Sequence, residues 1–216
     1  MVIDHVGLLF FPDMLLFRKI GRLSMPLFAF AIAEGCKYTK NKPKHFFLLF
    51  GLAVICQTVY YFFDSGNLYM CILVTFSLSV LTIYALQAFK QSLFDKDSTL
   101  SEKVLTGLLF ALVVFCVYAL NRLLTIDYGF WGCMTPVFAS LFDFHRIPAP
   151  AFLKRLDCIP VRAACMILPL IGIALVSNFG NLPYFALCAI PVLCLYNGEK
   201  GKLKTKYFFT YSIPYI

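Results

Sequence analysis

Charged side chains are scarce in this sequence. Asp, Glu, Lys and Arg make up 14% of the 216 residues, whereas a soluble domain averages roughly 25%. The deficit runs along the whole chain, and 61% of the residues are hydrophobic. A soluble globular domain is therefore excluded, and we expect a protein that crosses a membrane several times. No cleavable signal peptide is predicted, because the apolar character continues beyond the first segment.

Patterns typical of several other chemistries are also missing. The nine cysteines include no Cys-x-x-Cys pair and no histidine stands at ligand spacing, so we interpret them as small buried residues and expect no metal. No Gly-x-Ser-x-Gly turn is present, which argues against a covalent acyl-enzyme. The net charge of +8 does not indicate a nucleic-acid partner, since the positive residues lie in expected membrane loops, where topology and anionic headgroups of the lipid bilayer explain them.

Apolar segments are abundant, and up to nine are predicted to be helical. A spanning helix needs about 20 apolar residues, and the first and last segments have about half that length. We interpret these two as truncated spans, because the apolar pattern is already under way at Met1; the alternative is a pair of half-helices buried against the bundle. The expected fold is all-α: a polytopic membrane protein with about eight or nine transmembrane segments in a single domain, residues 1–216. The segments are 1–11, 20–39, 46–63, 68–89, 104–121, 128–144, 161–176, 182–195 and 207–216.

The Lys and Arg residues orient these segments. Fifteen of the nineteen lie in the loops that follow the even-numbered segments. Cytoplasmic loops of membrane proteins carry an excess of positive charge, so we place these loops and the N-terminus in the cytoplasm and the chain in the cell membrane. The four exceptions are Arg18, Lys19, Arg22 and Arg122.

The opening stretch places ionisable side chains beside apolar segments, where charges are costly and mark candidate functional sites. His5, next to Asp4, can take a proton from an amine or hydroxyl near neutral pH; the alternative is a solvated chain end. Arg18 and Arg22 are four residues apart and share a face if the helix starts early. They can bind an anionic group or stabilise an oxyanion, or extend to lipid phosphate.

Glu34 follows the apolar run 29–33 and is therefore predicted to lie within the membrane. We expect it to be buried in a functional or paired role, with Lys37, three residues on, as the group that neutralises it. The alternative is a simple interfacial ion pair. Tyr38 lies four residues after Glu34 and shares its helix face.

Two later motifs mark helix ends. Asp127 precedes Tyr128 at the start of a segment, and a carboxylate there suits the N-cap position. Asn197 and Gly198 form a natural helix stop. The glycines and lysines that follow can also cradle a phosphate.

Taken in order, these motifs resemble the TraX family, over nearly the whole chain. The family is named for an inner-membrane protein that acetylates the N-terminus of F-type pilin. Its members are similar to multipass acyltransferases in which a membrane histidine acts on an acyl-CoA donor. The C-terminal end departs from the family, whose members close with Tyr-Pro-x-His. The matching motifs are Asp4-His5-x-Gly7, Arg-x-Ile-Gly-Arg-Leu-Ser-x-Pro-Leu-Phe-Ala-Phe at 18–30, Glu-Gly-x-x-Tyr-Thr-x-Asn at 34–41, Asp127-Tyr128-Gly129, and Leu-Tyr-Asn-Gly-x-x-Gly at 195–201.

The resemblance implies acetyl transfer from acetyl-CoA to an unknown envelope protein, peptide or glycan. His5, beside Asp4, is the expected general base, and Arg18 or Arg22 the expected oxyanion or acceptor group. The alternative is a small-molecule transporter or a non-catalytic membrane assembly protein, because transporters also use intramembrane charges. The expected residues of the substrate channel are Glu34, Tyr38, Asn41, Asp127, Tyr128 and Asn197.

Overall fold

The computed structural model describes residues 15–63, 69–177 and 182–198. Over these residues the chain is helical and has no strand, apart from an isolated bridge between Met70 and Ile126. The all-α prediction is therefore confirmed. The helices are α2 (Leu15–Arg22), α3 (Ser24–Tyr38), α4 (Lys42–Phe63), α5 (Ile72–Phe94), α6 (Leu100–Leu123), α7 (Gly129–Ala139), α8 (Ala151–Arg155), α9 (Ile159–Cys165), α10 (Ile167–Val176), the 3-10 helix η1 (Leu182–Cys188) and α11 (Ala189–Cys194).

Four helical stretches of the described residues are long and apolar enough to cross a membrane: 42–62, 72–94, 100–123 and 159–176. The expected eight or nine spans are not established by this structure. The first and last predicted segments lie outside the described residues. Helix α7, with 11 residues, extends about 16 Å, roughly half of the ~30 Å hydrocarbon layer.

The predicted segment 20–39 is divided into two helices, α2 and α3. Pro26 lies in the first turn of α3, where its missing N–H removes the bond that would continue the helix back to the Arg22 carbonyl. The Ser24 hydroxyl donates instead to the Gly21 carbonyl, 2.7 Å away. The break therefore follows from local sequence, and it places Arg22 at the end of α2.

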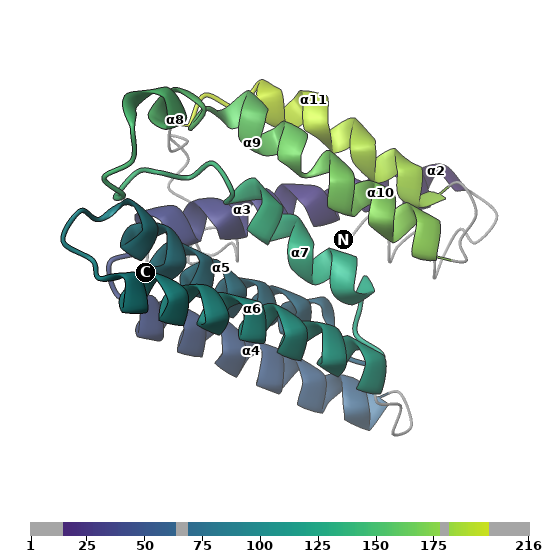
Figure 1. The fold of residues 1–216 in the computed structure, drawn as a ribbon. Helices are drawn as coiled ribbons and strands as arrows, with labels where there is room; N and C mark the ends of the chain where they lie inside the picture. The colour runs from purple at the N-terminus through teal and green to yellow at the C-terminus, as the bar shows by residue number, and fades with distance from the viewer. Residues whose placement is uncertain (1–14, 64–68, 178–181, 199–216) are drawn as a thin grey trace.

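Helix α5 packs against α4, α6 and α7, while α7 also packs against α3 and α10. Figure 1 shows α4, α5 and α6 on one side of the molecule and α9, α10 and α11 on the other, with α3 and α7 between them. The outer face of α6 is apolar and exposed, with Leu105, Leu108 and Phe115 each more than 60% exposed. Apolar surface of this extent requires a lipid or protein environment, as expected for a membrane protein.

Helix α7 ends inside the bundle, where its last carbonyl groups need donors. Two buried cations bind carbonyls here, one at the last residue of α7 and the other in the turn that follows the helix. The Lys90 ammonium donates to the carbonyls of Ser140 and Asp143, at 2.7 and 3.0 Å, and Arg162 Nε donates to the Ala139 carbonyl at 2.9 Å. Positive charge is also favourable at a helix C-terminus. Ser140 and Leu141 donate to the three preceding carbonyls of α7, so the helix ends without unpaired carbonyls, as an apolar environment requires.

Glu34 neutralises one of these cations. Its carboxylate accepts a hydrogen bond from Arg162 Nη1, and the two residues are only 8% and 1% exposed. The predicted burial and pairing of Glu34 are confirmed, but Lys37 is the wrong partner. Lys37 binds Asp157 instead, at 2.9 Å. Sequence spacing identifies neighbours on one helix, whereas Arg162, the partner of Glu34, lies on another helix, α9.

We predict that Glu34→Gln lowers the stability of the protein by about 3–5 kcal/mol, because it leaves the Arg162 charge buried without its counterion. The double variant Glu34→Leu/Arg162→Met should recover most of the loss, since it removes both charges. Thermal and denaturant unfolding in one detergent would measure both. Parental stability of Glu34→Gln would contradict this role of the pair.

Candidate functional site

A cavity of about 630 Å³ opens where α6 ends and α7 begins. We call it the outer cavity, because the loops around it are predicted to face away from the cytoplasm. Helices α2, α10 and η1 complete its wall, which is mainly apolar and aromatic with a few converging polar groups. The lining residues are Arg22, Met25, Tyr69, Tyr118, Asn121, Arg122, Thr125, Ile126, Asp127, Tyr128, Gly129, Phe130, Trp131, Leu170, Ile173, Val176, Ser177, Pro183 and Ala186.

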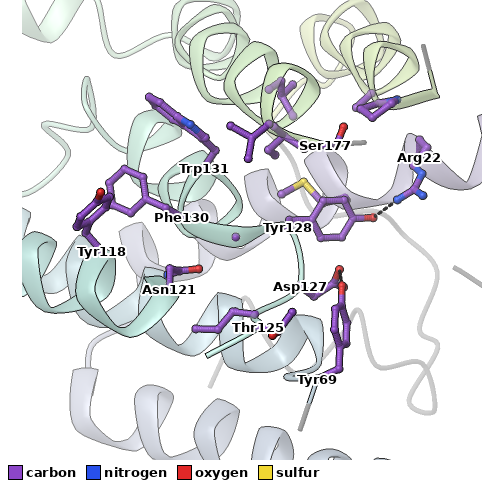
Figure 2. Close-up of a pocket in the computed structure, with 18 of the residues that line it drawn as sticks. Arg22, Tyr69, Tyr118, Asn121, Thr125, Asp127, Tyr128, Phe130, Trp131 and Ser177 are labelled. Carbon is purple, nitrogen blue, oxygen red and sulfur yellow. Dashed lines mark hydrogen bonds between the residues drawn. The ribbon is translucent and has the colours of Figure 1, made fainter. Parts of the chain in front are cut away.

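Tyr128 stands at the N-terminus of α7 with its hydroxyl accepting a hydrogen bond from Arg22 Nη1, at 3.2 Å (Figure 2). Its φ of 59° lies in the left-handed region, which is costly for a residue with a large side chain. Gly132 makes the position possible, since a Cβ there would lie 2.4 Å from Tyr128 Cβ. The backbone at Tyr128 is therefore locally strained, and this conformation directs the phenol toward Arg22.

Asp127 is not the N-cap that the sequence predicts, because Tyr128 occupies that position. The Asp127 carboxylate instead accepts a hydrogen bond from the Tyr69 hydroxyl at 2.8 Å (Figure 2). Its backbone is fixed to α5 and the preceding turn: the Thr75 hydroxyl donates to its carbonyl, and its N–H donates to the Met70 carbonyl. Burial, then the neighbouring Asp127, raises the pKa of Tyr69. The phenol therefore stays protonated and keeps donating well into the alkaline range.

Asn121 contributes an acceptor to the wall. Its Nδ2 donates to the Val117 carbonyl one turn earlier, at 2.8 Å. Its Oδ1 is buried and has no hydrogen-bond partner among the described residues. A buried acceptor left unpaired costs about 1–3 kcal/mol, so a bound N–H or O–H group would find a favourable position here.

A series of aromatic rings also lines the cavity, near Asn121 (Figure 2). Tyr118, Phe130 and Trp131 make an edge-to-face series, with ring centroids 5.6 and 5.7 Å apart. The indole of Trp131 lies directly on Gly172 of α10, where a Cβ would come within 2.4 Å of the ring. This close approach holds α10 against α7 and fixes the ring at the cavity edge.

The family model described as TraX protein matches residues 1–214. The chain belongs to the TraX family. The match includes every residue that lines the outer cavity and confirms the resemblance seen in the motifs. Searches of curated proteins and of solved structures gave no match.

Three of the predicted site residues of this TraX chain meet in the outer cavity: Arg22, Asp127 and Tyr128. They come from motifs more than 100 positions apart in the sequence. Asp4 and His5 lie outside the described residues. Arg18 lies on α2, four residues before Arg22, but this is a separate short helix and not an early start of the predicted segment 20–39; the side chain of Arg18 is outside the described part of the structure.

The other candidates lie elsewhere. Glu34 is in the core with Arg162. Tyr38 is exposed at the end of α3, with its ring 5.3 Å from His145. Asn41 precedes α4, where its Oδ1 accepts the Lys44 N–H, as a capping residue does. Asn197 and Gly198, whose φ is 75°, follow α11, which ends at Cys194 with Leu195 as its C-cap, so the helix ends before the predicted stop. None of these four lines the outer cavity.

Sequence reasoning missed several residues of the site and its support, namely Tyr69, Asn121, Arg122, Trp131 and Arg162. Asn121 and Arg122 end an apolar helix, where polar residues are ordinary. In the sequence, Arg162 is one of fifteen positive residues in the predicted cytoplasmic loops and has no feature that distinguishes it from the others. The one available signal was the position of Arg122 among the four positive residues on the non-cytoplasmic side.

We predict that Gly172→Ala displaces Trp131, because the new Cβ would overlap the indole. Overpacking of this kind costs about 1–3 kcal/mol. Trp131 is the only tryptophan in the chain, so its fluorescence reports the change directly, and we expect a red shift with a lower unfolding temperature. The matched control is Gly51→Ala on α4, where nothing lies within 4 Å of the new Cβ. Identical emission from both variants would contradict the packing described.

Proposed function

We propose that this chain is a membrane-embedded acyltransferase that moves an acetyl group from acetyl-CoA to an amine or hydroxyl of an envelope protein, peptide or glycan. The observation that supports it most is the meeting of Arg22, Asp127 and Tyr128 at one cavity in an otherwise apolar bundle. Membership of the TraX family supports the same reaction.

In this proposal the acceptor nitrogen or oxygen attacks the thioester carbonyl carbon. A tetrahedral oxyanion forms, the C–S bond then breaks, and CoA leaves as its thiol. The proton of the acceptor passes to His5, the proposed general base, and from His5 to the departing sulfur of CoA. Asp4 beside it is the proposed companion carboxylate.

Arg22 and Tyr128 are suited to the developing oxyanion. The guanidinium donates to the phenol oxygen, which polarises the O–H and makes Tyr128 a stronger donor. Preorganised donors of this kind stabilise the negative charge that develops in acyl transfer and account for much of the rate enhancement. Arg18, one turn earlier on α2, is a second candidate cation.

Asp127 and Asn121 are suited to the acceptor. The Asp127 carboxylate is fixed by Tyr69 and can receive an N–H or O–H from the attacking group. Asn121 Oδ1 offers a second acceptor in the lining of the same cavity. Acceptors and donors that line one cavity can orient a nucleophile against a carbonyl group.

We expect His5→Ala to lower acetyl transfer by at least about a hundredfold, because a positioned general base contributes roughly 10²–10⁴-fold. His5→Gln should not restore it, since an amide does not take up the proton. The measurement is transfer from labelled acetyl-CoA to envelope fractions by the purified protein. Activity of His5→Ala within a few-fold of the parent would remove His5 from the reaction.

Tyr128→Phe should lower the transfer rate by about 10²–10³-fold, because one oxyanion donor is lost while the ring is retained. Tyr60→Phe is the matched control, since that phenol is exposed on α4 and does not line the cavity. Equal rates for the two variants would argue against the donor role of Tyr128.

An uptake assay on the same protein reconstituted in liposomes distinguishes the acyltransferase from the alternative, a small-molecule transporter. Solute uptake without acetyl transfer would support that class instead. Mass spectrometry of envelope peptides and glycans, with and without the gene, would identify the acceptor.

A further inference from the structure

A second cavity, of about 240 Å³, lies where α3 ends, α4 begins and α5 ends. We call it the inner cavity. Thr75 supports the outer cavity and Gln87 lines the inner one; twelve residues of α5 separate them, or about 18 Å. The two cavities therefore lie toward opposite ends of the bundle. The residues lining the inner cavity are Cys36, Lys37, Lys42, Gln87, Gln91, Asp143, His145, Arg146 and Ile147.

The inner cavity is positively charged. Within the described residues, the ion pairs are Lys37–Asp157 and Glu34–Arg162, so Lys42 and Arg146 have no carboxylate within 4 Å. The Arg146 guanidinium donates to two backbone carbonyls, at 2.9 and 3.0 Å, which keeps its charge in place without cancelling it. Asp143 is the one carboxylate in the lining.

The walls are held rigidly. Arg146 fastens the turn after α7 to the end of α3, and Asp143 Oδ1 accepts the His145 N–H at 3.1 Å. Lys37 joins α3 to Asp157, whose other oxygen accepts the Phe144 N–H. A ligand would therefore enter a preformed site.

Donors predominate among the side chains that face this space. Lys42 brings an ammonium, placed 5.4 Å from the centroid of the Tyr84 ring, and Gln91 brings an amide group. Gln87 brings a second amide, whose Nε2 already donates one hydrogen bond, to the Cys36 carbonyl at 3.3 Å. Lys42 is also the first residue of α4, where the helix dipole favours negative charge. Ammonium and amide donors at a helix N-terminus suit the oxygens of a phosphate group.

We propose that the inner cavity binds a phosphate group, that of the nucleotide end of acyl-CoA; this identification of the donor rests on the proposed function. The asymmetry of Lys and Arg places this end of the bundle in the cytoplasm, where CoA is found. The flexible thioester arm must then extend along α5 to reach the outer cavity. A lipid headgroup of the cytoplasmic leaflet has the same phosphate chemistry, and the experiment separates the two sources.

The test measures binding of adenosine 3′,5′-bisphosphate, the nucleotide fragment of CoA, to the full chain in nanodiscs of zwitterionic lipid, by calorimetry. The parent should bind, and binding should weaken as salt increases. Lys42→Gln should lower the affinity at least about tenfold, the effect of losing one charge-assisted hydrogen bond. Lys40→Gln is the matched control: an exposed lysine two residues before Lys42 that does not line the cavity, with an expected change below about threefold.

Gln91→Glu provides a second variant in case Lys42→Gln fails to fold. It places a carboxylate in the wall and should weaken binding by repulsion. Parental affinity in either folded variant overturns the site, as does a parent that binds no bisphosphate.

The remaining outcomes test separately whether the cavity binds phosphate, whether its ligand is the acyl-CoA donor and whether the protein transfers acetyl groups. Displacement of the bisphosphate by glycerophosphoglycerol at equal concentration supports the phosphate site but overturns the donor as its ligand. A parent that binds the bisphosphate and transfers no acetyl group supports the site and overturns the proposed function. Transfer with an unchanged KM for acetyl-CoA in Lys42→Gln overturns the assignment to the donor.

Discussion

Neutralisation of buried positive charge is the constraint on which this bundle depends. Arg162 is almost fully enclosed, and its charge is tolerated because it binds the carboxylate of Glu34 on α3 and the last carbonyl of α7, that of Ala139. Lys90 of α5 binds two carbonyls of the turn that follows α7. In a chain surrounded by lipid, no water is present to hydrogen-bond buried cations and carbonyl groups, so they must be paired within the protein. These contacts join α3, α5, α7 and α9 at one place in the core.

Helix α7 connects these cations to the outer cavity. Its C-terminus lies at the cations, and its N-terminus lies at the outer cavity, where Tyr128 and Asp127 are held in the preceding turn. Hydroxyl groups of α5 secure it along the way: Thr75 donates to the Asp127 carbonyl and Ser79 to that of Cys133. Hydrogen bonds between membrane helices contribute about 0.6–2 kcal/mol each. One short helix thus connects the polar core to the candidate site.

The two cavities differ in character, as the two halves of the proposed reaction would require. The outer one is wide and aromatic, with a few polar groups that converge, which suits an acceptor of mixed chemistry. The inner one is smaller and lined by cations and amides. Helix α5 extends between them with its small hydroxyl residues turned inward: Thr75, Ser77, Ser79 and Thr82 are all buried.

The sequence by itself determined the class of the fold and most of its segments. Scarce charge and long apolar runs predict a helical membrane protein, because hydrocarbon admits few other structures. The polar residues after each apolar run predict roughly where the segments end, since these effects act within one turn, whereas the break beside Pro26 inside the predicted segment 20–39 was not predicted. The motif residues Arg22, Asp127 and Tyr128 were recognised as candidates from their order along the chain.

Only the tertiary structure decided which of these candidates meet and which groups support them. Lys37 was the expected partner of Glu34 because it is three residues away, yet the partner is 128 positions distant. Asp127 was the expected helix cap, yet the left-handed Tyr128 takes that place and frees the carboxylate to bind Tyr69. Periodicity describes the neighbours of a residue on its own helix. Partners on other helices depend on how the helices pack, and packing is a property of the whole chain.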